Sequence, residues 1–237
     1  MKSTAVQYGG SVIETRPERT RYHKDVTELE ADHPWFRILE RVPVGARVLD
    51  VGCGSGELGS LLTTRPARVD GLEMNADRAE SARRHLRRVV TGTAGPSADG
   101  GLDDDYDVIV FADVIEHIAD PEVTLRWAGG KLAPDGRIIA LIPNSANWKF
   151  RRKILWGDWS YEETGYFDRD HVRFFDIRTT RELGLRCRLA ELDVHYVADK
   201  LPKPMNTWRA GAAIAARKRP NLFASHTLIV WQARSGS

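Results

Sequence analysis

Glycines and carboxylates gather in the stretch VLDVGCGSGELG, where they could hold a charged or nucleotide-like ligand. Gly52, Gly54 and Gly56 follow directly after the apolar run that contains Asp50. Glycine lets a backbone approach a ligand where any Cβ would collide with it, so a glycine-rich turn after a strand is typical of nucleotide-like cofactors. The alternative is a tight turn without a ligand, which the further carboxylates described below disfavour.

The register of the glycines distinguishes between classes of cofactor. A GxGxxG pattern at Gly54, Gly56 and Gly59 would by itself predict a dinucleotide. The preceding apolar run, however, leads into Gly52, and counted from there the third glycine is replaced by Glu57. A glutamate there would repel a pyrophosphate, because the beginning of a helix stabilises negative charge. The loop therefore predicts a cofactor without phosphate groups and disfavours a nicotinamide-dependent oxidoreductase.

Two acids indicate which parts of the cofactor are bound. Asp50 lies inside the apolar run and suits a cationic amino-acid group better than an anionic one. Glu73 ends the next apolar run, where a carboxylate can accept hydrogen bonds from ribose hydroxyls. Met74 beside it either packs on an adenine ring or belongs to the core. An acidic clamp, a glycine loop and a ribose carboxylate together describe S-adenosylmethionine, with S-adenosylhomocysteine as its product.

Two histidines are placed for proton transfer. Methyl transfer from a sulfonium needs alignment of acceptor, methyl group and sulfur, and a base only where the acceptor begins protonated. A histidine of near-neutral pKa serves a hydroxyl or ammonium acceptor. His117 follows the fourth predicted strand and His171 follows the fifth. Asp168 would share a helical face with His171 and raise its basicity. The alternative is a structural role for both histidines.

An aromatic and basic insertion at 144–176 interrupts the alternation of strands and helices. Ligands of a doubly wound sheet lie outside the carboxyl ends of its strands, so the insertion is expected to be a lid over the acceptor. We expect aromatic walls and arginines that read an anionic or polar acceptor: Trp148, Trp159, Tyr166, Arg152 and Arg173. The alternative is that Phe174 and Phe175 merely anchor the insertion in the core.

The pattern of apolar runs predicts the elements that position these residues. Strands are expected at 46–52, 67–73, 89–92, 106–113, 136–143, 188–197 and 226–234, and helices at 57–64, 76–88, 120–132 and 179–186. Short β-rich runs that alternate with helices indicate parallel βαβ units. The predicted fold class is therefore α/β, with a doubly wound, mostly parallel seven-stranded sheet.

Composition limits the remaining functional classes. The 237 residues carry a net charge of +2, which is too balanced to predict a nucleic-acid partner. Cys53 and Cys187 form no CxxC pair and no zinc spacing occurs, so no metal is expected. Apolar runs fall short of the roughly 20 residues that cross a bilayer, and no signal-peptide core is present. We expect a cytoplasmic protein without stable membrane insertion.

A C-terminal stretch, WRAGAAIAARKRPNLFA, is amphipathic and ends in bases. By default it packs on the edge of the sheet. The alternatives are a partner subunit, which would give a homodimer, and a membrane surface.

These motifs resemble the class I S-adenosylmethionine-dependent methyltransferases, and the resemblance covers about residues 40 to 233. It rests on VLDVGCGSG, Glu73, YDVIVFADVIEHIADP and LAPDGRIIALIPN. It implies a Rossmann-like methyltransferase fold, with Asp50 and the three glycines at the methionine end of the cofactor and Ala112 and Asp113 closing the pocket. Thr93 departs from the family pattern, because many relatives place an aspartate there, near the adenine amino group.

The resemblance also implies a domain division and an acceptor. Residues 1–40 would form an N-terminal helical cover, with Tyr22 as a pocket wall, and 41–237 the methyltransferase domain, with the lid at about 144–176. The stretch LWGDWSYEETGYFDRDHVRFFD is similar to a segment of a branch common in bacterial surface-glycan and natural-product pathways. We expect methyl transfer to a hydroxyl, or less readily an amine, of a saccharide or small metabolite. Alternatives are a nucleic-acid or protein methyltransferase, which the IPN motif disfavours, and a non-catalytic cofactor-binding scaffold subunit.

Overall fold

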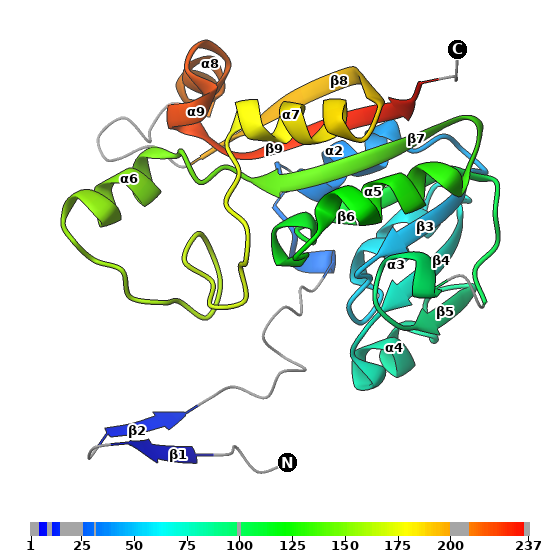
Figure 1. Cartoon of the computed structure of the whole chain (residues 1–237), viewed down its shortest axis with the longest axis horizontal. Helices are drawn as coiled ribbons and strands as arrows, with labels where there is room; N and C mark the ends of the chain where they lie inside the picture. Colours follow the sequence, from blue (N-terminus) through cyan, green and yellow to red (C-terminus); the bar gives the residue numbers. More distant parts are fainter. Residues whose placement is uncertain are drawn as a thin grey trace.

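The computed structural model describes residues 5–8, 11–14, 26–30, 32–98, 101–199 and 209–234. Within them, a seven-stranded sheet has the order β5-β4-β3-β6-β7-β9-β8 (Figure 1). Its strands are β3 (Arg47–Val51), β4 (Arg68–Glu73), β5 (Arg88–Thr91), β6 (Tyr106–Ala112), β7 (Leu132–Pro143), β8 (Leu189–Ala198) and β9 (Ala224–Ala233). Neighbouring strands from β5 to β7 are parallel, and β9 is antiparallel to both of its neighbours. The predicted doubly wound, mostly parallel sheet is confirmed.

Helices cover both faces of the sheet, as the near-continuous apolar character of its central strands requires. Successive side chains of β3 alternate between the faces, so that Val48 packs into one apolar cluster and Leu49 into the other. The first cluster includes residues of α2 (Pro34–Arg41), α3 (Glu57–Thr63) and α4 (Ala76–Ala82). The second includes residues of α5 (Pro121–Gly130) and α7 (Ile177–Arg186). The central strands are therefore buried on both sides.

One predicted helix is shorter than its amphipathic pattern suggests. The expected helix at 76–88 ends at Ala82, and the chain then turns toward β5. The turn places Leu86 in the core against Gly59 and Gly71, where a Cβ would leave no room for the leucine side chain. Burial of Leu86 thus outweighs the local helical preference of the arginine-rich segment.

The expected helical cover at 1–40 is wrong for its first described residues. β1 (Ala5–Tyr8) and β2 (Ser11–Glu14) pair as an antiparallel hairpin. The sequence AVQYGGSVIE carried that signal, because two short β-rich runs around Gly-Gly are typical of a hairpin. The helical prediction holds for η1 (Val26–Glu28) and α2, while Tyr22, expected as a pocket wall, lies outside the described residues.

The insertion after β7 begins with α6 (Trp148–Leu155) and continues as irregular chain to residue 176 (Figure 1). Two buried amides tie its base to β9. The Nδ2 atoms of Asn144 and Asn147 donate to the Ala224 carbonyl at 2.9 and 2.7 Å. Asn144 also bridges Phe175, so both ends of the insertion meet at the carboxyl end of β7.

The C-terminal amphipathic stretch folds as α8 (Arg209–Lys218) and α9 (Pro220–Phe223). α8 contacts β8, the edge strand of the sheet, which is the packing expected by default. Among the described residues, no helix is long and apolar enough to cross a membrane.

Candidate active site

The glycine turn between β3 and α3 depends on backbone conformations that other residues rarely adopt. Gly52, Gly54 and Gly56 have φ of 70°, 58° and 95°. A Cβ on Gly52 would lie 2.7 Å from Val114 Cγ2, and one on Gly56 would lie 3.1 Å from Ala82 Cα. At Gly54 the described atoms within 4 Å of that position belong to the Glu57 carboxylate, at 3.5 Å. The turn thus packs tightly at Gly52 and Gly56 and leaves space beside Gly54.

Glu73 connects the end of β4 to this turn. Its side chain is 4% exposed. Oε2 accepts the Gly54 N–H at 3.0 Å, and Oε1 accepts the Asn75 N–H at 2.8 Å. Two backbone donors therefore orient the carboxylate, and each oxygen retains a lone pair for a further donor. The predicted position beside the glycine turn is confirmed, while the bond to ribose stays a prediction.

Asp50 is an uncompensated buried acid beneath the turn. The residue is 2% exposed, and its Oδ2 has no hydrogen-bond partner among the described residues. Burial, reinforced by the charges of Glu57 and Glu73, raises the pKa of Asp50 to about 8. A buried carboxylate without a partner is unfavourable unless a cation approaches it. Asp50 therefore fits the ammonium group of S-adenosylmethionine.

The other predicted cofactor contacts differ in burial. Met74 is 70% exposed, so the alternative that it packs in the core is wrong. Its contact with adenine stays a prediction. Ala112 ends β6 half-buried, and Asp113 follows with φ of 57°. The Asp113 N–H donates to the Leu141 carbonyl at 3.0 Å, and its Oδ1 lies 3.3 Å from His226 Nε2. These contacts hold Asp113 at the carboxyl ends of β6 and β7.

Both predicted histidines meet at a buried glutamate. Glu116 lies in η3 (Ile115–His117), directly after β6, and its side chain is 3% exposed. Its Oε1 is 3.8 Å from His171 Nε2, and the rings of His117 and His171 are 4.7 Å apart between centroids. Burial raises the pKa of Glu116 well above its ordinary value, with a further contribution from Asp113. We call Glu116, His117 and His171 the acceptor-side cluster.

The predicted partnership of Asp168 and His171 is wrong in its geometry. The segment forms a turn, in which the His171 N–H donates to the Asp168 carbonyl at 3.1 Å, so the residues share no helical face. The Asp168 carboxylate accepts the Asp170 N–H at 2.9 Å. Burial lowers the pKa of His171, and the nearby His117 lowers it further; the charge of Asp168 opposes this shift but does not outweigh it. His171 is thus less basic than free histidine.

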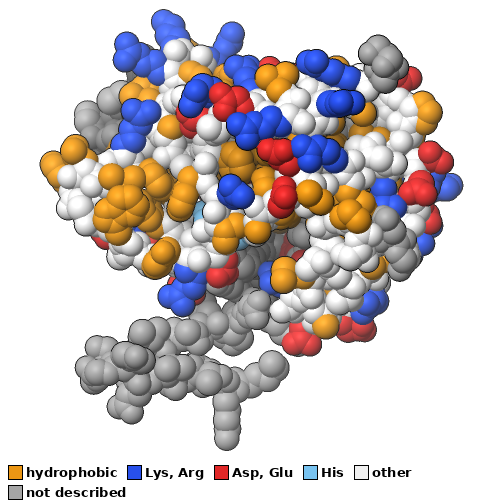
Figure 2. Space-filling model, in the orientation of Figure 1, with side chains coloured by type: hydrophobic (Ala, Val, Ile, Leu, Met, Phe, Trp, Pro, Cys, Tyr) orange, Lys and Arg blue, Asp and Glu red, His pale blue; other side chains and the backbone are white. Residues whose placement is uncertain are grey.

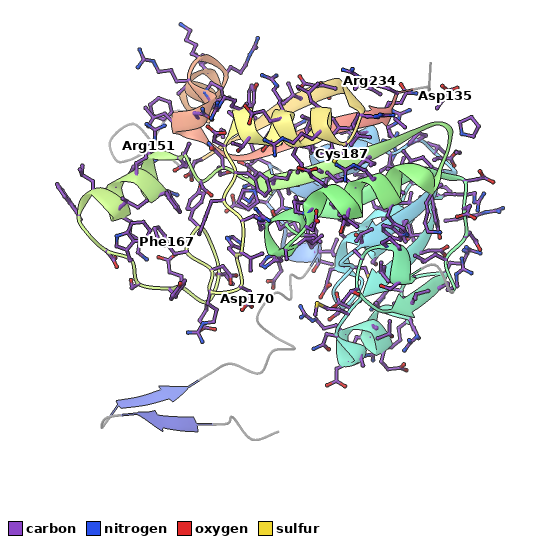
Figure 3. All side chains as sticks on the ribbon, in the orientation of Figure 1. Asp135, Arg151, Phe167, Asp170, Cys187 and Arg234 are labelled. Carbon is purple, nitrogen blue, oxygen red and sulfur yellow. The ribbon has the colours of Figure 1, made fainter. Side chains whose placement is uncertain are left out.

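Backbone hydrogen bonds attach the end of the lid to η3. The N–H groups of Val172 and Arg173 both donate to the Glu116 carbonyl at 3.0 Å. The Arg173 guanidinium donates to the Ala119 carbonyl, so in this conformation it stabilises the lid. Asp170 also faces His117, whose Nδ1 is 3.0 Å from the Asp170 carbonyl; Asp170 lies at the lower turn of the insertion in Figure 3.

The remaining predicted acceptor contacts lie on α6 and the lid loop. Trp148 is half-buried, with the Arg152 guanidinium 5.4 Å from its ring centroid. Trp159 is 63% exposed and packs edge-on against Phe167, which Figure 3 places in the lid loop. The Tyr166 hydroxyl donates to Asp199 at 3.3 Å, and burial raises the pKa of Tyr166. Their contact with an acceptor stays a prediction.

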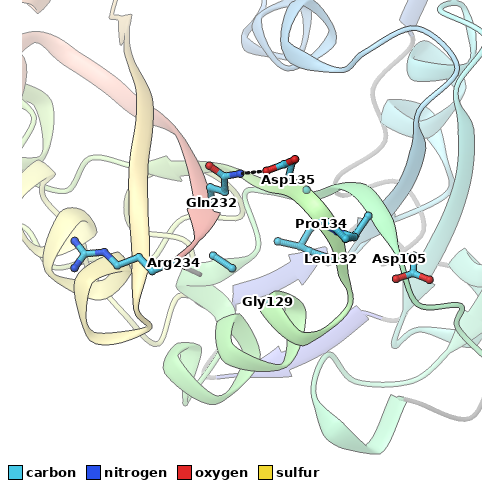
Figure 4. Close-up of a pocket in the computed structure, with 10 residues that line it drawn as sticks. Asp105, Gly129, Leu132, Pro134, Asp135, Gln232 and Arg234 are labelled. Atoms are coloured by element: carbon cyan, nitrogen blue, oxygen red, sulfur yellow. Dashed lines mark hydrogen bonds between the residues drawn. The ribbon is translucent and has the colours of Figure 1, made fainter. Parts of the chain in front are cut away.

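An open hollow of about 390 Å³ lies elsewhere on the domain (Figure 4). It is lined by Leu132, Pro134, Gly136 and Gln232, among others. These residues lie near the beginning of β7 and the end of the antiparallel β9, which is the amino-terminal edge of the parallel strands. Because cofactors of such sheets bind at the opposite edge, this hollow is unrelated to the glycine turn.

Sequence reasoning missed two residues of the site. Glu116 was passed over although it precedes His117 in the motif DVIEHIADP, where a carboxylate beside a candidate base is a usable signal. The sequence gives no signal for His226, which begins the predicted strand at 226–234. The register of β9 brings it opposite Pro143, at the carboxyl end of β7, and so beside Asp113.

Comparison with known proteins agrees with this geometry. The methyltransferase domain family matches residues 26–197. The chain belongs to this family. Relatives include the ubiquinone biosynthesis O-methyltransferase of Aeromonas salmonicida, 30% identical over 153 residues, which cover 62% of this chain and 61% of that protein. The enzyme of the same name from Xanthomonas axonopodis pv. citri is 24% identical over 77% of this chain and 76% of its own length.

The fold has a solved counterpart in an S-adenosylmethionine-dependent methyltransferase from Archaeoglobus fulgidus. The TM-score is 0.64 at 17% identity, covering 84% of this chain and 91% of that one. The family is that of S-adenosylmethionine-dependent methyltransferases, and S-adenosylmethionine is its methyl donor. Asp50, Glu73 and the glycine turn are the residues of this chain that fit it.

Proposed function

We propose that the protein transfers a methyl group from S-adenosylmethionine to a hydroxyl of a small molecule. The observation that carries this proposal is the acceptor-side cluster beside the glycine turn. Val114, two residues before Glu116, packs so closely on Gly52 that a Cβ there would lie 2.7 Å from it. A titratable cluster therefore adjoins the cofactor turn on the side where the lid lies, which suits a protonated acceptor.

When bound, S-adenosylmethionine would supply an electrophilic methyl group on a sulfonium. Asp50 would hold its ammonium and Glu73 its ribose. His171, whose pKa is lowered mainly by burial, is neutral at pH 7 and can accept the hydroxyl proton as sulfur leaves. The lid, fastened to η3 by the bonds to the Glu116 carbonyl, would exclude water and hold the acceptor in line.

Two similarities indicate the class of acceptor, and both favour small ring compounds. The lid stretch resembles that of the glycan and natural-product branch, which favours a saccharide. The O-methyltransferases of ubiquinone biosynthesis to which the chain is similar favour an aromatic hydroxyl. Trp148 and Tyr166 could pack on either kind of ring. We favour the saccharide or a related metabolite and keep the aromatic hydroxyl as the second candidate.

Calorimetric titration with S-adenosylmethionine and S-adenosylhomocysteine tests the cofactor assignment. We expect wild type to bind both compounds, Glu73→Ala to lose binding and His171→Ala to retain it. His85→Ala, which changes an exposed histidine of the turn after α4, is the matched control for His171→Ala. Absence of binding by wild type would overturn the proposal.

The acceptor is tested by transfer of a labelled methyl group to panels of glycosides and catechols. We expect transfer to a hydroxyl, lost in His171→Ala and kept in His85→Ala. Labelling of RNA or protein with neither panel modified would instead support the nucleic-acid or protein alternative. Cofactor binding without any transfer would indicate the scaffold subunit.

The arrangement of the whole chain adds two lesser proposals. Residues 1–40 would cover the cofactor and 41–237 would form the catalytic domain. A homodimer through α8 stays a prediction, and light scattering of the purified chain would test it.

A further inference from the structure

We propose that Glu116, His117 and His171 form a binding site for a divalent metal ion. Each side chain offers one ligand atom, and the three atoms lie within 4.8 Å of one another. Ligands of a transition metal bind at about 2.0–2.2 Å, so neighbouring ligand atoms lie roughly 3.0–3.5 Å apart. The distance of 3.8 Å between His171 Nε2 and Glu116 Oε1 approaches that spacing. Small side-chain rotations would complete the site.

The hydrogen bond of His117 leaves the correct nitrogen for a metal. Its Nδ1 lies 3.0 Å from the Asp170 carbonyl, which can only accept a hydrogen bond. Nδ1 therefore carries the proton in the neutral ring, and Nε2 carries the lone pair. Metal-binding histidines usually donate their other N–H to a carbonyl or carboxylate in this way. The turn at Asp170 thus orients His117 as a ligand.

The burial of Glu116 is the second, independent observation. Both carboxylate oxygens are inaccessible and have no hydrogen-bond partner among the described residues. The N–H groups of Val172 and Arg173 in the lid donate to the Glu116 backbone carbonyl and leave the carboxylate unsatisfied. A buried charge without compensation is strongly unfavourable, and a bound cation is one of the few ways to remove that cost. The other is a proton on the carboxylate, which the experiment below distinguishes.

The donor set indicates the class of ion. Two imidazoles and one carboxylate suit a transition metal such as Mn²⁺, Fe²⁺, Co²⁺ or Zn²⁺ better than Mg²⁺, which prefers oxygen ligands. Three protein ligands leave coordination positions open, as in catalytic metal sites. If the proposed function holds, an acceptor hydroxyl could occupy one of them and have its pKa lowered, so that its proton passes to water. In that ion-bound form His171 would hold the ion in place of accepting the proton. Binding of the ion itself does not depend on the proposed function.

The composition of the site explains why the sequence predicted no metal. That expectation rested on the cysteines and on the spacing of zinc ligands within one segment. Here two ligands follow β6 and the third lies in the lid, beyond β7 and α6. Packing of the lid on η3 brings them together.

The test titrates the full chain, freed of metal with a chelator, with MnCl₂, and follows free Mn²⁺ by electron paramagnetic resonance. We expect one Mn²⁺ per chain in wild type and at least a tenfold loss of affinity in Glu116→Gln and His171→Ala. His85→Ala should bind as wild type does. Thermal unfolding of each variant would establish that it is folded. Neither the methyl donor nor an acceptor is present, so failure here leaves the proposed function standing.

A second measurement needs no variant. Co²⁺ added to wild type should give visible absorption bands of a site with nitrogen ligands, and Zn²⁺ should displace it. Absence of stoichiometric Mn²⁺ and Co²⁺ binding would overturn the proposal and leave a protonated Glu116. Binding that survives Glu116→Gln and His171→Ala, or that is lost equally in His85→Ala, would overturn it as well.

Discussion

At the scale of single residues, Asp50 shows how a binding group can oppose the stability of the free protein. Its folded-state pKa of about 8 lies above the ordinary value of 3.8. The folded state therefore holds a proton that the unfolded chain releases between these two values. The contribution of this proton to stability is full below the lower value and is lost as pH rises through the upper one. At pH 8 the cofactor-free protein carries much of the cost of a buried charge.

Replacing Asp50 with asparagine should separate stability from binding. The asparagine amide cannot ionise, so we expect Asp50→Asn to raise the unfolding temperature of the cofactor-free protein at pH 8, with a gain that shrinks toward about pH 5. The same change removes the partner of the cofactor ammonium. Loss of a charge-assisted contact costs about 1.5–3 kcal/mol, or roughly 10- to 150-fold in affinity. Thermal unfolding across pH and calorimetric titration measure the two effects.

The matched control is Asp105→Asn, which changes an exposed aspartate whose positive φ asparagine tolerates. It should alter neither the pH dependence nor the affinity. A gain in stability for Asp50→Asn that is the same at pH 5 and pH 8 would contradict the role of the buried charge.

At the scale of elements, the sequence predicted those features that depend on residues close together in the chain. The strands, the glycine turn and the place of Glu73 follow from residues close together in the chain. The meeting of Glu116 with His171 does not, because it depends on hydrogen bonds from the lid to η3. The turn at Asp168 was missed although its hydrogen bonds, from the N–H groups of Asp170 and His171, are local: aspartate favours such turns, and the prediction of a shared helical face did not use that preference. The early end of α4 was also missed, because it follows from the burial of Leu86 against Gly59, which is a tertiary contact.

The turn between β3 and α3 allows a test that separates two effects of a substitution at Gly52: backbone strain at positive φ and collision of the new Cβ with Val114. Gly52 and Gly45 have similar φ, 70° and 77°, but a Cβ on Gly45 would meet nothing within 4 Å. An alanine at positive φ costs about 1–2 kcal/mol by itself. We expect Gly45→Ala to lose roughly that much stability and to keep cofactor affinity. Gly52→Ala should lose more stability and most of its affinity, because its Cβ displaces Val114.

The double variant Gly52→Ala with Val114→Ala provides the control, since it removes the colliding methyl groups. It should recover part of the stability of the single variant, as measured by denaturant unfolding. Equal losses in Gly45→Ala and Gly52→Ala would mean that backbone strain alone matters and that the contact with Val114 does not.

At the scale of the whole molecule, the buried acids of the sheet and its loops differ in whether hydrogen bonds satisfy them. Near the carboxyl edge, Asp50 and Glu116 have carboxylate oxygens without a hydrogen-bond partner among the described residues. Beyond it, the lid exposes apolar side chains, visible as the orange cluster over the α6 region in Figure 2; they include Leu155, Trp156, Trp159 and Tyr161. Asp70, a buried acid in the middle of β4, instead accepts hydrogen bonds from three side chains. We therefore expect the unsatisfied acids to serve binding and the satisfied Asp70 to serve stability.

Asp70 is the centre of a hydrogen-bonded network and gives the sharpest test of this difference between buried acids. Its side chain is 1% exposed and accepts hydrogen bonds from Arg87, Arg88 and the Tyr106 hydroxyl, joining β4, β5 and β6. Burial, with the Asp70 hydrogen bond, raises the pKa of Tyr106 to about 12. Both guanidiniums are partly exposed and can be solvated when Asp70 is neutralised, which limits the loss.

We therefore expect Asp70→Asn to cost about 1–3 kcal/mol of unfolding free energy and to lower the unfolding temperature by several degrees. Affinity for S-adenosylhomocysteine should not change, because Asp70 pairs with Leu49 and so lies on the opposite face of the sheet from Asp50, while Glu73 lies at the carboxyl end of β4. Denaturant unfolding and calorimetry of the same preparation measure both quantities. Asp50→Asn should show the reverse pattern at pH 8, with higher stability and weaker binding. If Asp70→Asn weakened binding as much as Asp50→Asn does, the two acids would be energetically coupled across the sheet, and the raised pKa of Asp50 would have to be attributed to the sheet as a whole.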